Sequence, residues 1–129
     1  MPVLVDTSVW IDFFRGRPTA EVDRFKAMLG SEEVLIGDLI LSEILQGIHD
    51  KEDLIEAETA LKAFKVVPLV GEEIARESTF NYRLLRGKGI TVRKTIDCLI
   101  ATWCIRNSFP LLHADRDFRP FAALGLIEL

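Results

Sequence analysis

Short apolar runs alternate with longer amphipathic stretches along the chain. The five runs that we expect to form strands are residues 3–5, 34–36, 66–67, 111–112 and 126–128. The stretches between them have helical periodicity, and this alternation is typical of a parallel sheet covered by helices. The pattern therefore predicts an α/β fold with three layers, α/β/α, around a central, mostly parallel sheet of about five short strands.

Capping residues and helix breakers divide the amphipathic stretches into the expected helices. Thr7 and Ser8 are good caps for the first helix, Thr19 caps the second, and Pro110 ends the most apolar one. The expected helices cover residues 9–14, 19–29, 38–48, 50–64, 71–86, 94–107 and 118–124. No repeat, low-complexity tract or linker interrupts this series, so we expect a single domain over residues 1–129.

Composition restricts the possible partners and the compartment. The formal net charge of −4 argues against wrapping nucleic acid by overall charge, so a polyanion would need a local basic patch. Cys98 and Cys104 lie in an apolar stretch without a zinc-site pattern, which favours buried free thiols in a reducing compartment. The chain shows no signal peptide and no apolar segment of about 20 residues, so we expect a cytoplasmic protein with no membrane association.

Three of the expected strands run into an aspartate, namely Asp6, Asp38 and Asp115. In open α/β sheets, ligands bind just beyond the carboxyl ends of the strands. Asp6 therefore lies where such a fold does its chemistry. Taken alone, a role as the cap of the following helix explains Asp6 equally well.

Three further acids stand out because of their neighbours. Asp97 lies in the most apolar helix, where an ionised carboxylate is costly unless it is paired, although a place in the first turn also favours an anion. Glu43 borders the apolar side of its helix, where simple solvation is the ordinary alternative. Asp117 follows Asp115 by two residues, and two acids there exceed what a turn or cap needs.

Several carboxylates at one edge of a sheet repel one another unless a cation holds them together. Oxygen ligands select hard divalent ions, and a site with room for water and phosphate suits Mg²⁺ or Mn²⁺. The chemistry that such a site supports is phosphodiester hydrolysis, with a water activated by the metal.

A basic segment offers a possible contact for a nucleic-acid backbone. Arg83, Arg86, Lys88 and Arg93 follow one another without an intervening acid and include the flexible Gly87-Lys88-Gly89 loop. Ordinary solubilising charge is the alternative explanation for these four residues.

Four motifs in register along nearly the whole chain resemble PIN-domain endoribonucleases, and more narrowly the VapC toxins of type II toxin–antitoxin pairs. They are Val5-Asp6-Thr7-Ser8-Val9-Trp10-Ile11, Ser42-Glu43-Ile44 with Gln46-Gly47, Asp97-Cys98-Leu99-Ile100-Ala101, and His113-Ala114-Asp115-Arg116-Asp117-Phe118. The resemblance implies a PIN-like fold in which Asp6 and Asp97 are the principal Mg²⁺ ligands and Glu43 completes the metal and water shell. It implies a fourth site acid at Asp115 or Asp117, with Asp115 as the further metal ligand, and Thr7 or Ser8 orienting Asp6.

The resemblance also implies partners: tRNA or ribosomal RNA as substrate, a VapB-type antitoxin, and a second copy of the chain in a homodimer. Two other functions stay open on the residues alone. One is a non-catalytic RNA-binding PIN relative, against which the retained acids argue, because carboxylates repel RNA without a metal. The other is a receiver-like module phosphorylated on Asp6, which would require an acid pair and a lysine that the sequence lacks at the corresponding places.

Overall fold

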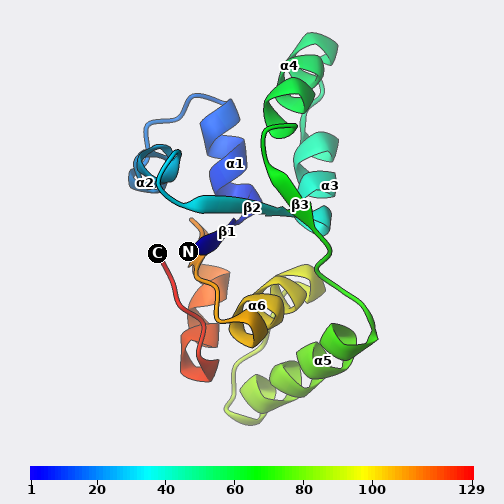
Figure 1. The fold of residues 1–129 in the computed structure, drawn as a ribbon. Coiled ribbons are helices and arrows are strands. Elements are labelled where there is room, and N and C mark those ends of the chain that lie inside the picture. Colours follow the sequence, from blue (N-terminus) through cyan, green and yellow to red (C-terminus); the bar gives the residue numbers. More distant parts are fainter.

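The computed structural model describes all 129 residues and places a parallel sheet between two groups of helices (Figure 1). The sheet has four strands in the order β3-β2-β1-β4, and every pairing in it is parallel. The strands are β1 (Pro2–Val5), β2 (Glu33–Gly37), β3 (Lys65–Val67) and β4 (Leu111–Leu112). The predicted α/β architecture with a central parallel sheet is thus confirmed.

The segment predicted as a fifth strand, residues 126–128, contributes one isolated bridge instead of a strand. Glu128 pairs in parallel with Leu111, and the backbone N–H of Leu111 donates to the Ile127 carbonyl at 2.9 Å. β4 has only two residues, and the C-terminal segment pairs with one of them. The C-terminus therefore lies along the edge of the sheet, next to the N-terminus (Figure 1).

The helices cover both faces of the sheet. In the view of Figure 1, one group of helices lies above the sheet and a second group lies below it. The upper helices are α1 (Thr7–Phe14), α2 (Ala20–Met28), α3 (Asp38–Gly47) and α4 (Lys51–Leu61), and the lower elements are α5 (Glu72–Gly87), α6 (Thr95–Asn107) and η1 (Arg116–Leu124). None of the helices combines the length and the apolar composition that a membrane span requires.

Two element boundaries differ from the sequence prediction for identifiable reasons. The first helix begins at Thr7 because Asp6 is its N-cap, so Thr7 and Ser8 lie inside the first turn and not before it. The last helix is a 3-10 segment that starts at Arg116 and contains Pro120, which has no N–H to donate within a helix.

The aromatic side chain of Trp10 joins the first strand to the upper helices. Trp10 is fully buried, packs edge-on against Phe25 and Phe64 with ring centroids 4.9 and 5.0 Å away, and its indole N–H donates to the Val5 carbonyl at 3.1 Å. Because Val5 is the last residue of β1, this contact fixes the start of α1 relative to the strand end. Asp6, which lies between the two elements, is held in place as a result.

Candidate active site

Asp6 links β1 to α1 and is buried, with 5% of the residue exposed. Its Oδ2 atom accepts the Ser8 backbone N–H at 3.1 Å and the Ser8 hydroxyl at 2.7 Å. Burial raises the pKa of the Asp6 carboxyl, and the charge of Glu43 raises it further, against the lowering effect of the Ser8 hydrogen bonds. Asp6 thus caps α1 and remains a buried carboxylate beside another acid.

Asp97 lies in the first turn of α6 with 7% of the residue exposed. Its Oδ2 atom is buried and has no hydrogen-bond partner, so the favourable helix end does not satisfy the whole carboxylate. Burial raises the pKa of Asp97 to about 7, and the charge of Asp6 adds to that rise. Asp115 and Glu43 act in the same direction, whereas Lys94 lowers the pKa.

Glu43 is half-buried in α3, and a hydrogen bond from α1 orients it. The Thr7 hydroxyl donates to Glu43 Oε1 at 2.8 Å. The sequence predicted that Thr7 or Ser8 would orient Asp6. In the structure Ser8 contacts Asp6, and Thr7 contacts Glu43. The two adjacent hydroxyl residues therefore hold two different acids.

Asp115 and Asp117 follow β4 and lie at the start of η1. Asp115 is the N-cap of this segment and accepts the Asp117 backbone N–H at 2.9 Å. Carboxylate oxygens of Asp97, Asp115 and Asp117 lie within 4.8 Å of one another. Asp6 and Glu43 lie outside this tight group, but near enough for their charges to raise the pKa of Asp97.

His113 connects this acidic loop to the C-terminus, which the sequence alone did not indicate. The Asp115 backbone N–H donates to His113 Nδ1 at 3.1 Å, so Nδ1 is the acceptor and the proton is assigned to Nε2. That Nε2 atom lies 2.8 Å from Glu128 Oε1. The Ser8 hydroxyl also accepts the Ala114 backbone N–H at 3.0 Å. The contact of His113 with Glu128 and that of Ala114 with Ser8 hold the loop that carries Asp115 in place.

The donor set fits a hard divalent cation. The unpartnered Asp97 Oδ2 and the two carboxylates beside it supply only oxygen atoms, which suits Mg²⁺ or Mn²⁺. A cation among them would give the buried oxygen a partner and offset the repulsion that raises the pKa of Asp97. The acidic cluster is therefore consistent with a metal site.

The structure divides the predicted RNA-binding residues between two places. Arg83 and Arg86 line a small cleft on α5 with Tyr82, and the Arg86 guanidinium donates to the Tyr82 hydroxyl at 3.2 Å. Lys88 caps the end of α5. Arg93 lies in a separate cleft with Arg116 and Arg119, two residues that the sequence analysis left out because they lie more than twenty positions further along the chain.

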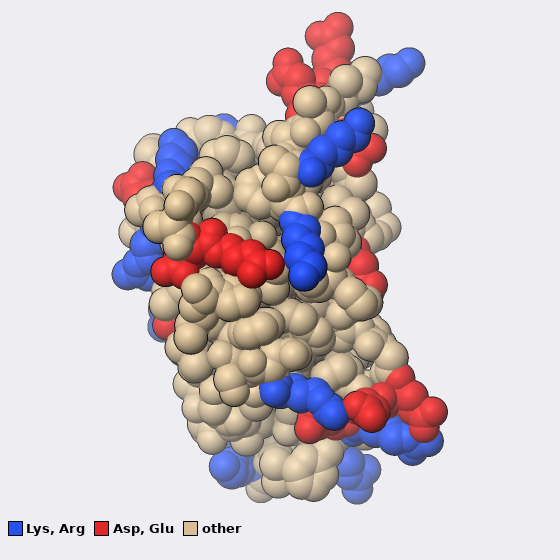
Figure 2. Space-filling view, in the orientation of Figure 1, with Lys and Arg blue, Asp and Glu red and all other residues tan.

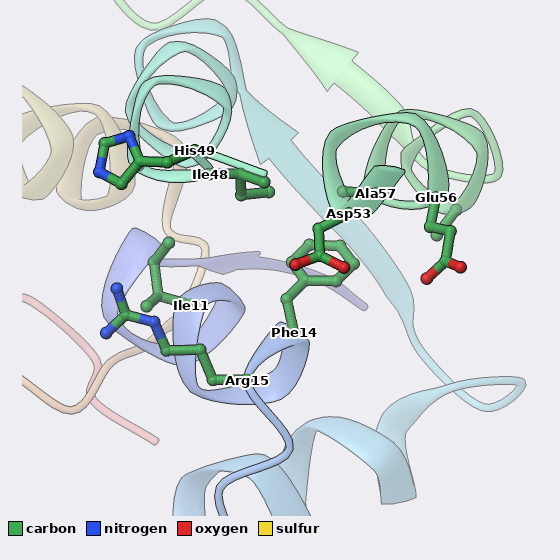
Figure 3. Close-up of a pocket in the computed structure, with 10 residues that line it drawn as sticks. Ile11, Phe14, Arg15, Ile48, His49, Asp53, Glu56 and Ala57 are labelled. Atoms are coloured by element: carbon green, nitrogen blue, oxygen red, sulfur yellow. The ribbon is translucent and has the colours of Figure 1, made fainter. Parts of the chain in front are cut away.

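A further groove of about 470 Å³ opens between α1, the end of α3 and α4 (Figure 3). Ile11, Phe14 and Ile48 supply apolar surface there, and Asp53 and Glu56 line the α4 side. The five site acids do not line this groove. It is therefore a surface distinct from the acidic cluster.

Comparisons with known proteins agree with this geometry. Residues 3–124 match the model of the PIN domain family. The chain is 30% identical to ribonuclease VapC11 of Mycobacterium tuberculosis over 128 residues, which cover 98% of this chain and 96% of that protein. In a structure of VapBC2 from Rickettsia felis bound to a promoter DNA fragment, a chain of 16% identity aligns with a TM-score of 0.80, covering 100% of this chain and 98% of that one.

A second solved structure is similar over the same length. Mycobacterium tuberculosis VapC20, a sarcin-ricin loop cleaving toxin, has a TM-score of 0.69 at 16% identity, and the match covers 98% of each chain. At 16% identity the two solved structures show only that the fold is shared. The ribonuclease activity is inferred from the match to the PIN domain model and from the similarity to VapC11. The chain belongs to the PIN-domain family, as a VapC-type ribonuclease toxin of a toxin–antitoxin system.

Proposed function

We propose that the chain is a Mg²⁺- or Mn²⁺-dependent endoribonuclease, one domain over residues 1–129, that hydrolyses phosphodiester bonds in tRNA or ribosomal RNA. The observation that carries the proposal is Asp97 Oδ2, a buried carboxylate oxygen without a partner, among acids from three other places in the chain. Such an arrangement is unfavourable unless a cation binds there. A metal-dependent reaction at these acids explains why the chain retains this electrostatically unfavourable arrangement.

Asp6, Glu43, Asp97 and Asp115 would hold the ion, and Asp117 would complete the catalytic set. When bound, the ion supplies positive charge that activates a water and stabilises the departing oxygen of the phosphodiester. Ser8 keeps Asp6 in one orientation through its 2.7 Å hydrogen bond. Thr7 holds Glu43 through its hydrogen bond to Oε1, which would leave Oε2 to contact the ion or its water.

The choice of RNA rests on the relatives. VapC20 is a sarcin-ricin loop cleaving toxin, and the fold of this chain matches it along its length. A structured loop of ribosomal RNA is therefore one substrate class to test, with tRNA as the other. Both classes present single-stranded nucleotides whose backbone can reach a partly buried acidic site.

Mapping of new RNA 5′ ends after induction tests this function. We expect wild-type protein to produce discrete ends in tRNA or ribosomal RNA and to arrest growth. Asp97→Asn and Asp6→Asn should do neither, whereas Asp23→Asn, an exposed acid on α2, should behave as wild type. Wild-type rates of cleavage by the Asp97→Asn protein would refute the proposed ligands. RNA binding of equal strength with and without Mg²⁺, and no cleavage, would favour a non-catalytic relative.

We further propose a VapB-type antitoxin as partner, in the cytoplasm. The R. felis relative was solved as a toxin–antitoxin complex. The groove between α1, α3 and α4 suits an amphipathic helix, because apolar side chains line it beside Asp53 and Glu56. The acids predict basic residues on the antitoxin. A double variant that reverses both charges, Asp53→Lys with Glu56→Lys, should therefore no longer co-purify with the antitoxin.

We also propose that two copies of the chain form a homodimer. Phe80 and Leu84 lie one turn apart on α5 and are 62% and 40% exposed. An exposed pair of large apolar side chains among polar neighbours is typical of an interaction surface. Size-exclusion chromatography with light scattering should give a dimer, and Phe80→Lys should shift it to a monomer.

A further inference from the structure

A cleft of about 550 Å³ lies directly beside the acidic cluster and carries the opposite charge. It is formed by the loop between α5 and α6 and by the first turns of η1. The residues that line it are Thr91, Val92, Arg93, Arg116, Asp117, Arg119 and Pro120. The lining therefore contains three arginines and one acid.

The three arginines of this cleft have no acidic partner. Neither the ion pairs nor the side-chain hydrogen bonds of the structure include Arg93, Arg116 or Arg119. Other exposed arginines, such as Arg24, also lack an acidic partner, but here three of them gather in one cleft beside the site acids. In a protein with 20 acids and 16 lysines and arginines, three unpaired arginines in one cleft indicate an external anion.

Asp117 belongs both to this cleft and to the acidic cluster, so the two are adjacent. It lines the cleft, and one of its carboxylate oxygens lies within 4.8 Å of oxygens of Asp97 and Asp115. An RNA strand with one phosphodiester at the acids would therefore run next to this cleft with its neighbouring phosphates. Arg116 and Arg119 lie on either side of Asp117 in sequence, so the same segment supplies both the acidic side chain and two of the basic ones.

The lining favours the phosphates over the bases. Val92 is the one apolar side chain apart from the Pro120 ring, and no aromatic ring is present to stack on a base. Guanidinium groups match phosphate oxygens in a bidentate geometry. The α4 end of the molecule is less suited to RNA, since acids gather there (Figure 2).

We propose that Arg93, Arg116 and Arg119 form a binding site for the phosphates of RNA adjacent to the scissile bond. This inference rests on the proposed function, since it takes RNA as the substrate. The site binds the backbone and reads no base, because phosphate contacts set the register of a nucleic acid and carry no sequence information. It extends the predicted basic contact at Arg93 to two arginines of the acidic loop itself.

Binding of a fluorescein-labelled single-stranded RNA of mixed sequence, measured over a series of salt concentrations, tests the site directly. The Asp97→Asn background prevents cleavage during the titration. The triple variant Arg93→Gln, Arg116→Gln and Arg119→Gln should bind on the order of 10–100-fold more weakly, with a salt slope smaller by about 2. Replacing the same residues with lysine should preserve most of the slope. Arg24→Gln, which removes an exposed and unpaired arginine on α2, is the matched control.

Cleavage kinetics in the wild-type background separate this inference from the proposed function. The triple glutamine variant should lose more activity on long RNA, through KM, than on a dinucleotide too short to span both places. Normal RNA cleavage by the wild type, with a triple variant that binds and cuts like Arg24→Gln, would overturn the arginine site and leave the ribonuclease proposal standing. The expected salt slopes with no cleavage by the wild type would support the site and refute the ribonuclease proposal.

Discussion

Asp97 is under more electrostatic strain than a surface carboxylate, for two physical reasons. Its Oδ2 atom is the one buried side-chain oxygen or nitrogen of the structure without a hydrogen-bond partner. Burial and the charge of Asp6 then raise its pKa from 3.8 to about 7. Above that pH the metal-free protein holds a buried charge that only Lys94 partly offsets.

The shifted pKa predicts how metal-free stability depends on pH. Between the usual pKa of 3.8 and about 7, the folded chain keeps a proton on Asp97 that the unfolded chain has lost. The free energy of unfolding in EDTA should therefore fall as the pH rises through this window, by at most about 4 kcal/mol from this residue, and level off above it. Urea unfolding at a series of pH values measures the effect.

Asp97→Asn is the matched variant for that experiment, because it keeps the shape and removes the titration. Its unfolding free energy should vary less with pH and exceed that of the wild type above the pKa of Asp97. Parallel curves for the two proteins would show that Asp97 is not the strained group.

Ser8 provides a second prediction at the scale of the residue. Its hydroxyl donates to Asp6 and accepts from the Ala114 N–H, so Ser8→Ala removes two hydrogen bonds and leaves Asp6 Oδ2 with the Ser8 backbone N–H alone. We expect a loss of about 1–3 kcal/mol in the free energy of unfolding and a 10–100-fold loss of metal affinity. Ser42→Ala on the exposed side of α3 is the control and should change stability by less than about 0.5 kcal/mol. A Ser8→Ala protein that matches this control would contradict the role of the hydroxyl.

At the scale of elements, the junction of β2 and α3 depends on a glycine. Gly37 ends β2 and precedes α3, the helix that carries Glu43. A methyl group on Gly37 would collide with the side chain of Leu69, which is fully buried. Neither β2 nor α3 can move away without displacing the sheet. A glycine is therefore required at position 37 because the Leu69 side chain lies so close, and not because the backbone needs a glycine's conformational freedom.

Gly37→Ala should consequently destabilise the fold by about 1–3 kcal/mol through overpacking. The collision is specific to Leu69, so a double-mutant cycle with Leu69→Ala isolates it. We expect the double variant to lose less stability than the sum of the single variants. Strict additivity, measured by urea unfolding, would mean that the two side chains do not compete for space.

The sequence predicted those elements whose signals are local. The apolar runs around Val3 and Val34, and the acids at Asp6 and Asp97, were visible without coordinates because strand burial and buried charge leave a pattern in neighbouring residues. The loss of the fifth strand was not predictable, since it depends on pairing with a distant segment, where only the Leu111–Glu128 bridge forms.

Contacts between distant segments account for the rest of what the sequence missed. The Thr7–Glu43 hydrogen bond and the His113–Glu128 pair join residues far apart in the chain, and no periodicity encodes them. The gathering of Arg93 with Arg116 likewise depends on how the loop before α6 folds onto η1. The sequence suffices to propose the site acids, whereas the contacts that support them require the fold.

At the scale of the whole molecule, the acids meet only when the chain is folded. Asp6 follows β1, Glu43 lies in α3, Asp97 in α6, and Asp115 in the loop after β4. No preformed site exists in the unfolded chain, so an ion that binds this set stabilises the fold by mass action. At a free ion concentration of 100 times Kd, the gain is about 2.7 kcal/mol.

Calorimetric titration of Mg²⁺ or Mn²⁺ into the protein, above the pKa of Asp97, tests most directly whether these acids form one metal site. The account predicts saturable binding to the wild type and to Asp23→Asn, and its loss in Asp6→Asn and in Asp97→Asn. Equal binding by the wild type and the Asp97→Asn protein would contradict it.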